Sequence, residues 1–212
     1  MDRPILGNIP NLLRAGRTAP AVIEELRSIR IRLQDACGPG PMTMAITSHG
    51  ASEGKTFITA NLGLSFADAG MRTIVLDGDV RQGGLHRLLE AKRIPGLADY
   101  LNGDAGQEEI VQETTFPSLW FIACGRRFPP GAELLRSPGM GGLITSLRAQ
   151  FDVTLVDTAS VSAGDDPLVL GSVTGNVLCV LPNRGRDRDA AQASIGALDR
   201  PPLHLLGIVM NG

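Results

Sequence analysis

Apolar residues gather in short runs along this chain, and stretches with a helical period lie between most of the runs. The runs predict strands at residues 42–47, 73–76, 119–123, 153–156, 176–181 and 205–210. The helical period predicts helices at residues 56–69, 139–150, 167–172 and 187–198. Strands that are apolar on both sides must be covered on both faces. The pattern therefore predicts a doubly wound, mostly parallel α/β sheet with helices on both faces.

The N-terminal part of the chain departs from this alternation. Residues 1–19 are rich in Pro, Gly and Asn and lack a sustained period, so we expect an extended arm there. From Pro20 apolar positions recur about every 3.6 residues with charged residues between them, which predicts a helix over residues 20–36. Residues 20–212 are expected to form one domain that begins with this helix.

Composition narrows the class of protein. A chain of 212 residues with 43% hydrophobic residues is long enough for one well-buried core. Its net charge of -2 argues against a nucleic-acid partner, because duplex binding normally needs a basic face. The three cysteines lie far apart in the sequence, which predicts free thiols in a reducing compartment. We see no signal peptide and no apolar run long enough for a bilayer, so we expect a soluble, intracellular chain.

The segment Ser48–Thr56 has the order expected of a phosphate-binding loop. It follows a predicted strand, ends in Gly54-Lys55-Thr56, and leads directly into a predicted helix. Backbone N–H groups and the helix N-terminus can face phosphates, the lysine can reach the β and γ oxygens, and the hydroxyl can bind Mg²⁺. His49 occupies the position of the first glycine in the strict motif, and Gly50 follows it. The alternative is an ordinary strand, turn and helix with a solvated lysine.

Carboxylates follow two other predicted strands. Asp77 and Asp79 come directly after residues 73–76, and Asp157 comes directly after residues 153–156. The carboxyl ends of parallel strands are where open α/β sheets build their sites. Carboxylates at these positions can hold Mg²⁺ and can accept a proton from an attacking hydroxyl. Taken singly, each aspartate could equally be a helix cap.

Together these motifs resemble the bacterial tyrosine kinases of capsule and exopolysaccharide synthesis, which are relatives of the MinD/ParA ATPases. The resemblance rests on the loop at residues 48–56, the acidic motif at residues 77–81 and a Walker B strand at residues 151–157. It implies that residues 20–212 are a P-loop nucleotide-binding and kinase domain that uses ATP and Mg²⁺. The implied function is ATP-dependent phosphorylation of protein tyrosine, which regulates exopolysaccharide polymerisation and export.

The resemblance also implies roles for individual residues. The implied catalytic residues are Lys55, Asp77, Asp79 and Arg81, with Asp77 as the base toward tyrosine. The implied nucleotide-binding residues are Gly50, Ala51, Ser52, Glu53, Gly54, Lys55, Thr56, Phe57 and Asn211, with Asn211 facing adenine. The implied metal ligands are Thr56, Asp79 and Asp157. The implied oligomer interface is Glu24, Arg27 and Arg30, for which a solvated charged face is the alternative.

The partners follow from the same resemblance. It implies a ring of identical subunits, a protein substrate that bears tyrosine, and a membrane-embedded polysaccharide co-polymerase or a fused transmembrane region. The chain would then lie in the cytoplasm at the inner face of the bacterial membrane, held by that partner or by a fused N-terminal region.

Departures from the family pattern leave two other interpretations open. Ala51-Ser52 replaces the usual Pro-Gly of the loop, Thr158-Ala159-Ser160 replaces Thr-Pro-Pro, and Tyr100 is the one tyrosine. A serine in place of glycine is expected to resist a positive φ. These departures favour a catalytically weak, nucleotide-binding scaffold subunit as the first alternative. The second alternative is a MinD/ParA-like ATPase, against which Gly50 stands in place of that branch's second lysine.

Overall fold

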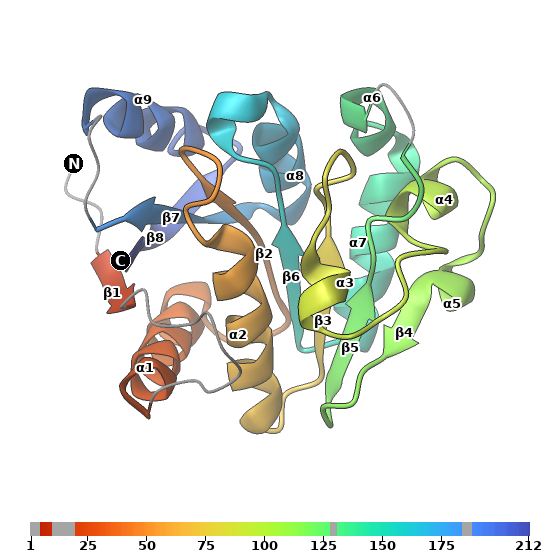
Figure 1. The fold of residues 1–212 in the computed structure, drawn as a ribbon, viewed down its shortest axis with the longest axis horizontal. Helices are drawn as coiled ribbons and strands as arrows, with labels where there is room; N and C mark the ends of the chain where they lie inside the picture. The colour runs from red at the N-terminus through yellow and green to blue at the C-terminus, as the bar shows by residue number, and fades with distance from the viewer. Residues whose placement is uncertain (1–4, 10–19, 128–130, 184–187) are drawn as a thin grey trace.

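A computed structural model describes residues 5–9, 20–127, 131–183 and 188–212, and these residues form an eight-stranded sheet (Figure 1). The strand order is β1-β8-β7-β2-β6-β3-β5-β4, and all neighbours are parallel except β4 and β5. The strands are β1 (Ile5–Ile9), β2 (Met42–Ser48), β3 (Thr73–Asp77), β4 (Val111–Glu113), β5 (Leu119–Ile122), β6 (Val153–Asp157), β7 (Asn176–Pro182) and β8 (His204–Asn211).

Helices cover both faces of this sheet (Figure 1). The helices are α1 (Pro20–Cys37), α2 (Lys55–Asp68), α3 (Leu85–Leu88), α4 (Leu97–Leu101), α5 (Gln107–Ile110), α6 (Gly131–Leu135), α7 (Pro138–Gln150), α8 (Asp166–Thr174) and α9 (Arg188–Leu198), with a 3₁₀ turn, η1 (Val161–Ala163). Apolar residues of α1, α2 and α3 share one core cluster, and those of α4, α7 and α8 share another. The predicted doubly wound α/β fold is confirmed.

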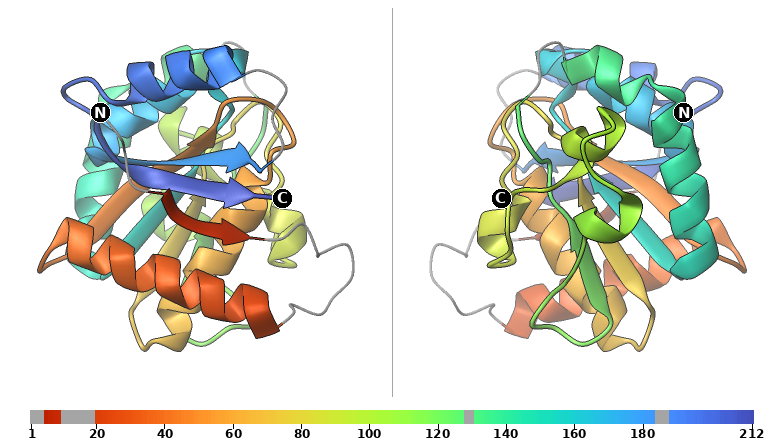
Figure 2. Two further views of the ribbon diagram at one scale, coloured as in Figure 1. Left: turned by 90° about the vertical axis from the view of Figure 1, so that its left-hand side faces the viewer. Right: turned by 90° about the vertical axis from the view of Figure 1, so that its right-hand side faces the viewer.

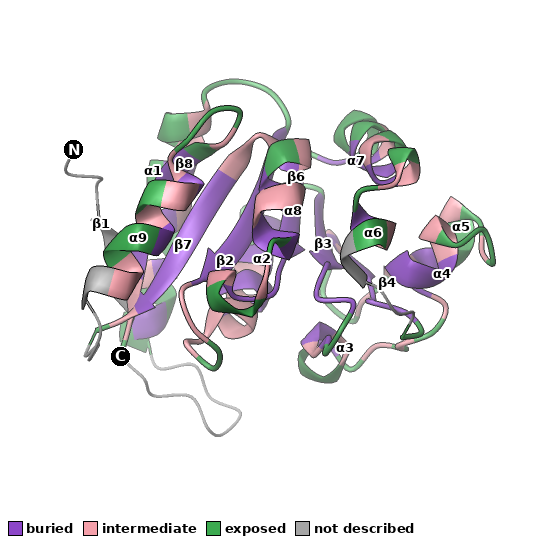
Figure 3. Ribbon diagram, turned by 90° about the horizontal axis from the view of Figure 1, so that it is seen from above, coloured by how far each residue is buried: buried purple, intermediate pink, exposed green. Residues whose placement is uncertain are grey.

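The central strands are apolar because both of their faces are covered. Every residue of β2, β3 and β6 is buried, as the purple strands of Figure 3 show. Phe66 of α2 and Phe121 of β5 are among the largest fully buried side chains. Burying one such side chain stabilises the fold by roughly 1.5–3 kcal/mol. The continuous apolar runs that predicted these strands are therefore a direct result of the two helical layers.

The N-terminal arm contributes a strand that the sequence did not predict. β1 pairs in parallel with β8 at one edge of the sheet, with Ile9 opposite Asn211 (Figure 2). Residues 1–4 and 10–19 of the predicted arm lie outside the described residues. The helix predicted from residue 20 is confirmed as α1, which contacts β1 and α2. In the part of the chain that the structure describes, no helix is both long enough and apolar enough to cross a membrane.

The strand order brings three loops together at the carboxyl edge of the sheet. β6 lies between β2 and β3, so the loops that follow these strands are neighbours. Asp77 is opposite Asp157 in the pairing of β3 with β6, and Asp157 is opposite Ile46 in the pairing of β6 with β2. Open α/β sheets bind ligands at such an edge. The fold therefore gathers the predicted phosphate loop and the predicted carboxylates at one place.

Candidate active site

The phosphate loop connects β2 to α2, and two of its residues, Ser52 and Gly54, have a positive φ. Gly54, directly before Lys55, has a φ of 90°. A Cβ at Gly54 would overlap the side-chain amide of Asn211, so glycine is required for space as well as for conformation. That amide donates a 2.9 Å hydrogen bond from its Nδ2 to the Glu53 carbonyl. The end of β8 therefore contacts the loop directly.

The three predicted carboxylates lie together and are buried. Asp77 is 0% exposed, Asp157 is 1% exposed and Asp79 is 9% exposed. Asp77 Oδ2 accepts a 3.2 Å hydrogen bond from the Leu85 N–H, whereas Asp77 Oδ1 has no hydrogen-bond partner among the described residues. A buried, unpartnered carboxylate oxygen is costly, and it is one place where a ligand proton or cation would be stabilised.

Burial and crowding change the titration of this cluster. Burial, followed by the negative charge of Asp157, raises the pKa of Asp77 to about 8. Burial also raises the pKa of Asp157 to about 7, although the Lys55 ammonium and the hydroxyls of Thr56 and Thr59 oppose that rise. The cluster therefore holds protons near neutral pH, and a bound cation would lower both pKa values.

The oxygen atoms around Asp157 are suited to bind Mg²⁺. The Thr56 hydroxyl bonds to the Asp157 carboxylate, and Thr59 Oγ1 donates to Asp157 Oδ1 at 3.2 Å. Thr56, Asp79 and Asp157 offer only oxygen, which is the ligand type that Mg²⁺ prefers. In the described ranges, no group of three His, Cys, Asp or Glu side chains could hold a metal ion by itself. A magnesium ion here would therefore need oxygens from a nucleotide as well.

Gly83 explains how the loop after β3 approaches Asp77 so closely. Its φ is 46°, and a Cβ there would overlap Cys124 Sγ and lie 3.2 Å from Asp77 Oδ2. Only glycine fits both conditions. Cys124 is a free, buried thiol, and the thiols of Cys37 and Cys179 are free as well, as the sequence predicted.

Comparison with known proteins shows what this chain is similar to. No family model matches the chain. EpsB of Ralstonia nicotianae, whose name places it with the tyrosine-protein kinases, is 37% identical over 191 residues, which cover 89% of this chain and 25% of EpsB. The tyrosine-protein kinase CpsD of Streptococcus agalactiae is 28% identical over 196 residues, covering 92% of this chain and 85% of CpsD. Both of these relatives, which are named as tyrosine-protein kinases, are similar to this chain over most of its length. The chain spans about a quarter of the length of the first curated relatives that it matches.

Solved structures with the same fold include kinase domains and an ATPase. The chimerical protein CapA2B2 superposes with a TM-score of 0.91 at 26% identity, covering 99% of this chain and 94% of that protein. The kinase domain of the Escherichia coli tyrosine kinase ETK also gives a TM-score of 0.91, at 24% identity over 99% of this chain and 90% of that domain. MinD of Pyrococcus horikoshii, solved with Mg-ADP, gives 0.70 at 22% identity, covering 81% of this chain and 70% of MinD. The last two likenesses show the fold alone.

The phosphate loop has a positive φ at Ser52, one of the positions where the sequence departs from the usual pattern. Ser52 has a φ of 61°, although serine was expected to resist a positive φ. The left-handed conformation costs a residue with a Cβ roughly 1–2 kcal/mol. The loop therefore accepts a local strain that glycine would avoid.

His49 and Phe57 both contact elements that lie beside the phosphate loop. His49 Nδ1 is 2.8 Å from Ser194 Oγ on α9, and the His49 carbonyl accepts a 3.0 Å hydrogen bond from the Ser162 N–H. Phe57, which the resemblance grouped with the nucleotide-binding residues, is partly buried against the core cluster of α1 and α2. Both residues thus anchor the loop to its neighbours.

Arg81, predicted to be catalytic, forms an ion pair that the sequence did not predict. Its Nε lies 3.0 Å from Asp166 Oδ2, and its Nη2 donates to Asp166 Oδ1 at 3.2 Å. Asp166 lies in the first turn of α8 and is buried. In the sequence, Asp166 followed by Pro167 indicates the start of a helix. Nothing in that pattern indicates that Asp166 pairs with a residue in the loop after β3.

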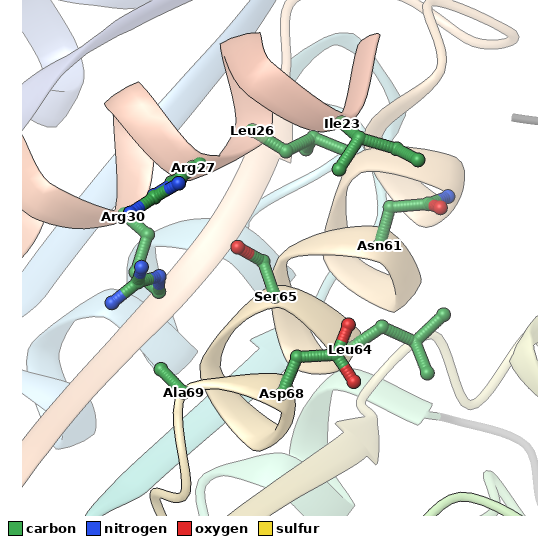
Figure 4. Close-up of a pocket in the computed structure, with 9 residues that line it drawn as sticks. All are labelled: Ile23, Leu26, Arg27, Arg30, Asn61, Leu64, Ser65, Asp68 and Ala69. Carbon is green, nitrogen blue, oxygen red and sulfur yellow. The ribbon is translucent and has the colours of Figure 1, made fainter. Parts of the chain in front are cut away.

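The predicted interface residues lie apart from this edge of the sheet. Arg27 and Arg30 of α1 line a groove of about 440 Å³ that α1 forms with α2, where Asn61, Ser65 and Asp68 line the other side (Figure 4). Ile23, which is 52% exposed, also lines the groove, whereas Glu24 is exposed beside it. The two sets of predicted residues therefore form two separate surfaces.

Proposed function

We propose that this chain is an ATP-dependent protein-tyrosine kinase domain that acts in the regulation of exopolysaccharide or capsule polymerisation and export. One observation carries the proposal. Asp77 Oδ1 is buried and has no described hydrogen-bond partner, in a cluster that includes Asp157 beside Lys55 and Thr56. A carboxylate available as a base, next to donors for phosphate and metal, is what transfer from ATP to a hydroxyl requires.

Each residue then has a task. The loop N–H groups and Lys55 would bind the phosphates, and Asn211 would hold the loop beside the adenine. Thr56, Asp79 and Asp157 would hold Mg²⁺, which when bound neutralises charge on the phosphates. Asp77 would accept the proton of the tyrosine hydroxyl at Oδ1. Because the pKa of Asp77 is raised to about 8, this base is strong enough to take a proton near neutral pH once it is deprotonated.

The partners are part of the same proposal. Tyr100 lies half-buried on α4, so we infer that the phosphorylated tyrosine belongs to another protein or to a segment outside this chain. Self-association into a ring would use Glu24, Arg27 and Arg30. A membrane-embedded co-polymerase, or a transmembrane region fused to the chain, would hold the domain at the inner face of the membrane.

Calorimetry with Mg-ADP and Mg-ATP tests the nucleotide site. Wild type is expected to bind both with micromolar affinity, and Lys55→Met is expected to abolish binding because it removes the cation that faces the phosphates. The chain offers a matched control, since Lys92 is the other lysine and is exposed. Lys92→Met should bind as wild type does. A folded wild type that binds no nucleotide would instead favour a non-enzymatic scaffold subunit, to which the strained Ser52 would contribute.

Transfer of labelled phosphate to a tyrosine-bearing partner tests the reaction itself. Asp77→Asn should lower the rate by about 10² or more while Mg-ADP binding is kept, because the isostere cannot accept the proton. Asp35→Asn on the exposed end of α1 is the control and should leave the rate unchanged. Phosphate that never appears on tyrosine with any partner would overturn the kinase proposal.

A further inference from the structure

The ion pair between Arg81 and Asp166 has a geometry suited to orienting the arginine. Two nitrogens of the guanidinium face the two oxygens of Asp166, at 3.0 Å from Nε to Oδ2 and 3.2 Å from Nη2 to Oδ1. The contact from Nη2 to Oδ1 is a hydrogen bond, and the one from Nε to Oδ2 is an ion pair without hydrogen-bond geometry. Two points of contact restrict the orientation of a guanidinium more than a single contact does. The Asp166 side chain is 1% exposed and that of Arg81 is 46% exposed. Asp166 is thus a buried anchor, and Arg81 extends from it toward solvent.

The pair lies where the two carboxylate-bearing loops meet. Arg81 is two residues beyond Asp79, whose Oδ1 accepts a 3.0 Å hydrogen bond from the Gln82 N–H and so turns the loop at Arg81. Asp166 follows the loop after β6, which the Ser162 N–H joins to the His49 carbonyl of the phosphate loop. Gly164 of the same loop passes close to the guanidinium, where a Cβ would lie 3.5 Å from Nη2. Arg81 is therefore held at the border of the candidate active site.

We propose that Asp166 is a positioning residue that presents Arg81 to the phosphoryl group during transfer. The inference rests on the proposed function insofar as it requires a nucleoside triphosphate at this site. Negative charge spreads over the transferring group, and an arginine supplied from the same chain can stabilise it. Asp166 accepts a hydrogen bond from Nη2 and lies beside Nε, and among the described residues no hydrogen bond is made by Arg81 Nη1, so this nitrogen remains to donate to phosphate.

A purely structural ion pair would behave differently. It would change stability alone, and the chain provides an example for comparison in the adjacent residue. Asp165 Oδ2 lies 3.5 Å from Arg136 Nη2, with both side chains more than half exposed. Exposed pairs of this kind contribute little. Substitutions at positions 165 and 166 therefore compare two neighbouring aspartates on one helix end, of which only the second holds an arginine beside the candidate active site.

Calorimetry with Mg-ADP, alone and with aluminium fluoride as a mimic of the transferring phosphoryl group, tests the proposal without depending on phosphate transfer. Wild type should bind the mimic complex more tightly than Mg-ADP. Asp166→Asn should reduce that gain by about 10-fold or more, while its affinity for Mg-ADP stays within about 3-fold of wild type. Arg81→Gln should lose the same gain in affinity for the mimic complex. The double variant should lose no more than either single variant, because both changes remove the same contact of Arg81 with the mimic.

The controls make each outcome decisive. Asp165→Asn should keep the full gain. If Asp166→Asn does not fold, Arg81→Lys replaces it, because lysine keeps the charge at an exposed position but cannot pair at two points. Arg81→Lys should also lose the gain. An undiminished gain in Asp166→Asn or Arg81→Lys, additive losses in the double variant, or a wild type without any gain would overturn the inference. A wild type that shows the gain but never phosphorylates tyrosine would overturn the proposed function and leave this inference supported.

Discussion

Charge is buried at the carboxyl ends of β3 and β6, whereas along α1 it is exposed. At the strand ends Asp77 and Asp157 are fully enclosed, and their pKa values rise to about 8 and about 7. In the α1–α2 groove Arg27 is exposed and Arg30 is half-buried, and Asp68 of α2 lines the same groove (Figure 4). Enclosed charges strain the protein that holds them, and exposed charges do not. The first region is expected to affect stability and chemistry, and the second is expected to affect association.

The largest expected effect concerns the pH dependence of stability. Asp77 and Asp157 have higher pKa values in the folded chain than the ordinary value of 3.8 that applies once the chain unfolds. Their stabilising contribution is fully present below that value and is lost as the pH rises through about 7 and about 8. The melting temperature in metal-free buffer, followed by circular dichroism, should therefore fall as the pH is raised from 3.8 toward about 8 and should level off above that pH.

Asp77→Asn sharpens this prediction because it removes one of the two titrating groups. Its melting temperature should change less with pH than that of wild type, and it should exceed that of wild type at alkaline pH. Asp35→Asn, at an exposed position, should retain the wild-type slope. A wild-type melting temperature that does not fall over this range would show that the two carboxylates are not held as the structure places them.

Substitutions in the α1–α2 groove are expected to change the oligomeric state of the protein. Charge reversal by Arg27→Glu and Arg30→Glu together is expected to shift the protein toward the monomer, because the proposed ring interface would then carry acidic groups beside Asp68. Mg-ADP affinity should stay at the wild-type value. Arg148→Glu, on the exposed face of α7, is the control. Sedimentation velocity gives the readout, and a wild type that remains monomeric at high concentration would remove the ring proposal.

The smallest effect compares one kind of hydrogen bond in the two regions. Asn211 Nδ2 donates to the Glu53 carbonyl at 2.9 Å, and Asn61 Nδ2 in the groove donates to the Phe57 carbonyl at 2.8 Å. Asn211→Ala should weaken Mg-ADP binding by about 1 kcal/mol, the typical contribution of one such bond, whereas Asn61→Ala should leave binding unchanged. Equal losses in both variants would indicate a general effect on α2 rather than a contact with the phosphate loop.

The sequence predicted the parts of the fold that depend on local pattern. Six strands and the longer helices follow from apolar runs and helical period, and their observed ends differ from the predicted ones by a residue or two. Asp187, the first residue of one predicted helix, lies outside the described residues. The short helices α3 to α6 and the three-residue strand β4 were missed, because elements of this length contain too few residues to show a period.

In the candidate site, too, the sequence predicted the residues that follow a local pattern and missed the features that depend on distant parts of the chain. Lys55, Asp77 and Asp157 were found because each follows a recognisable strand or loop, and the parallel sheet then brings them together. Asp166 was missed because its partner is 85 residues away, and no spacing in a single sequence signals such a pair. The positive φ of Ser52 was missed for a related reason, since the surrounding loop, and not the serine, dictates its conformation.

The strand β1 also protects the sheet at its long edge. β8 is eight residues long and mostly buried, and β1 pairs with its C-terminal half (Figure 2). A protein shortened to begin at Pro20 would present the unpaired N–H and C=O groups of β8 to solvent. Such an edge is a template on which other chains can add strands. Solubility during recombinant expression should therefore depend on retaining residues 5–9, even though none of them belongs to the candidate active site.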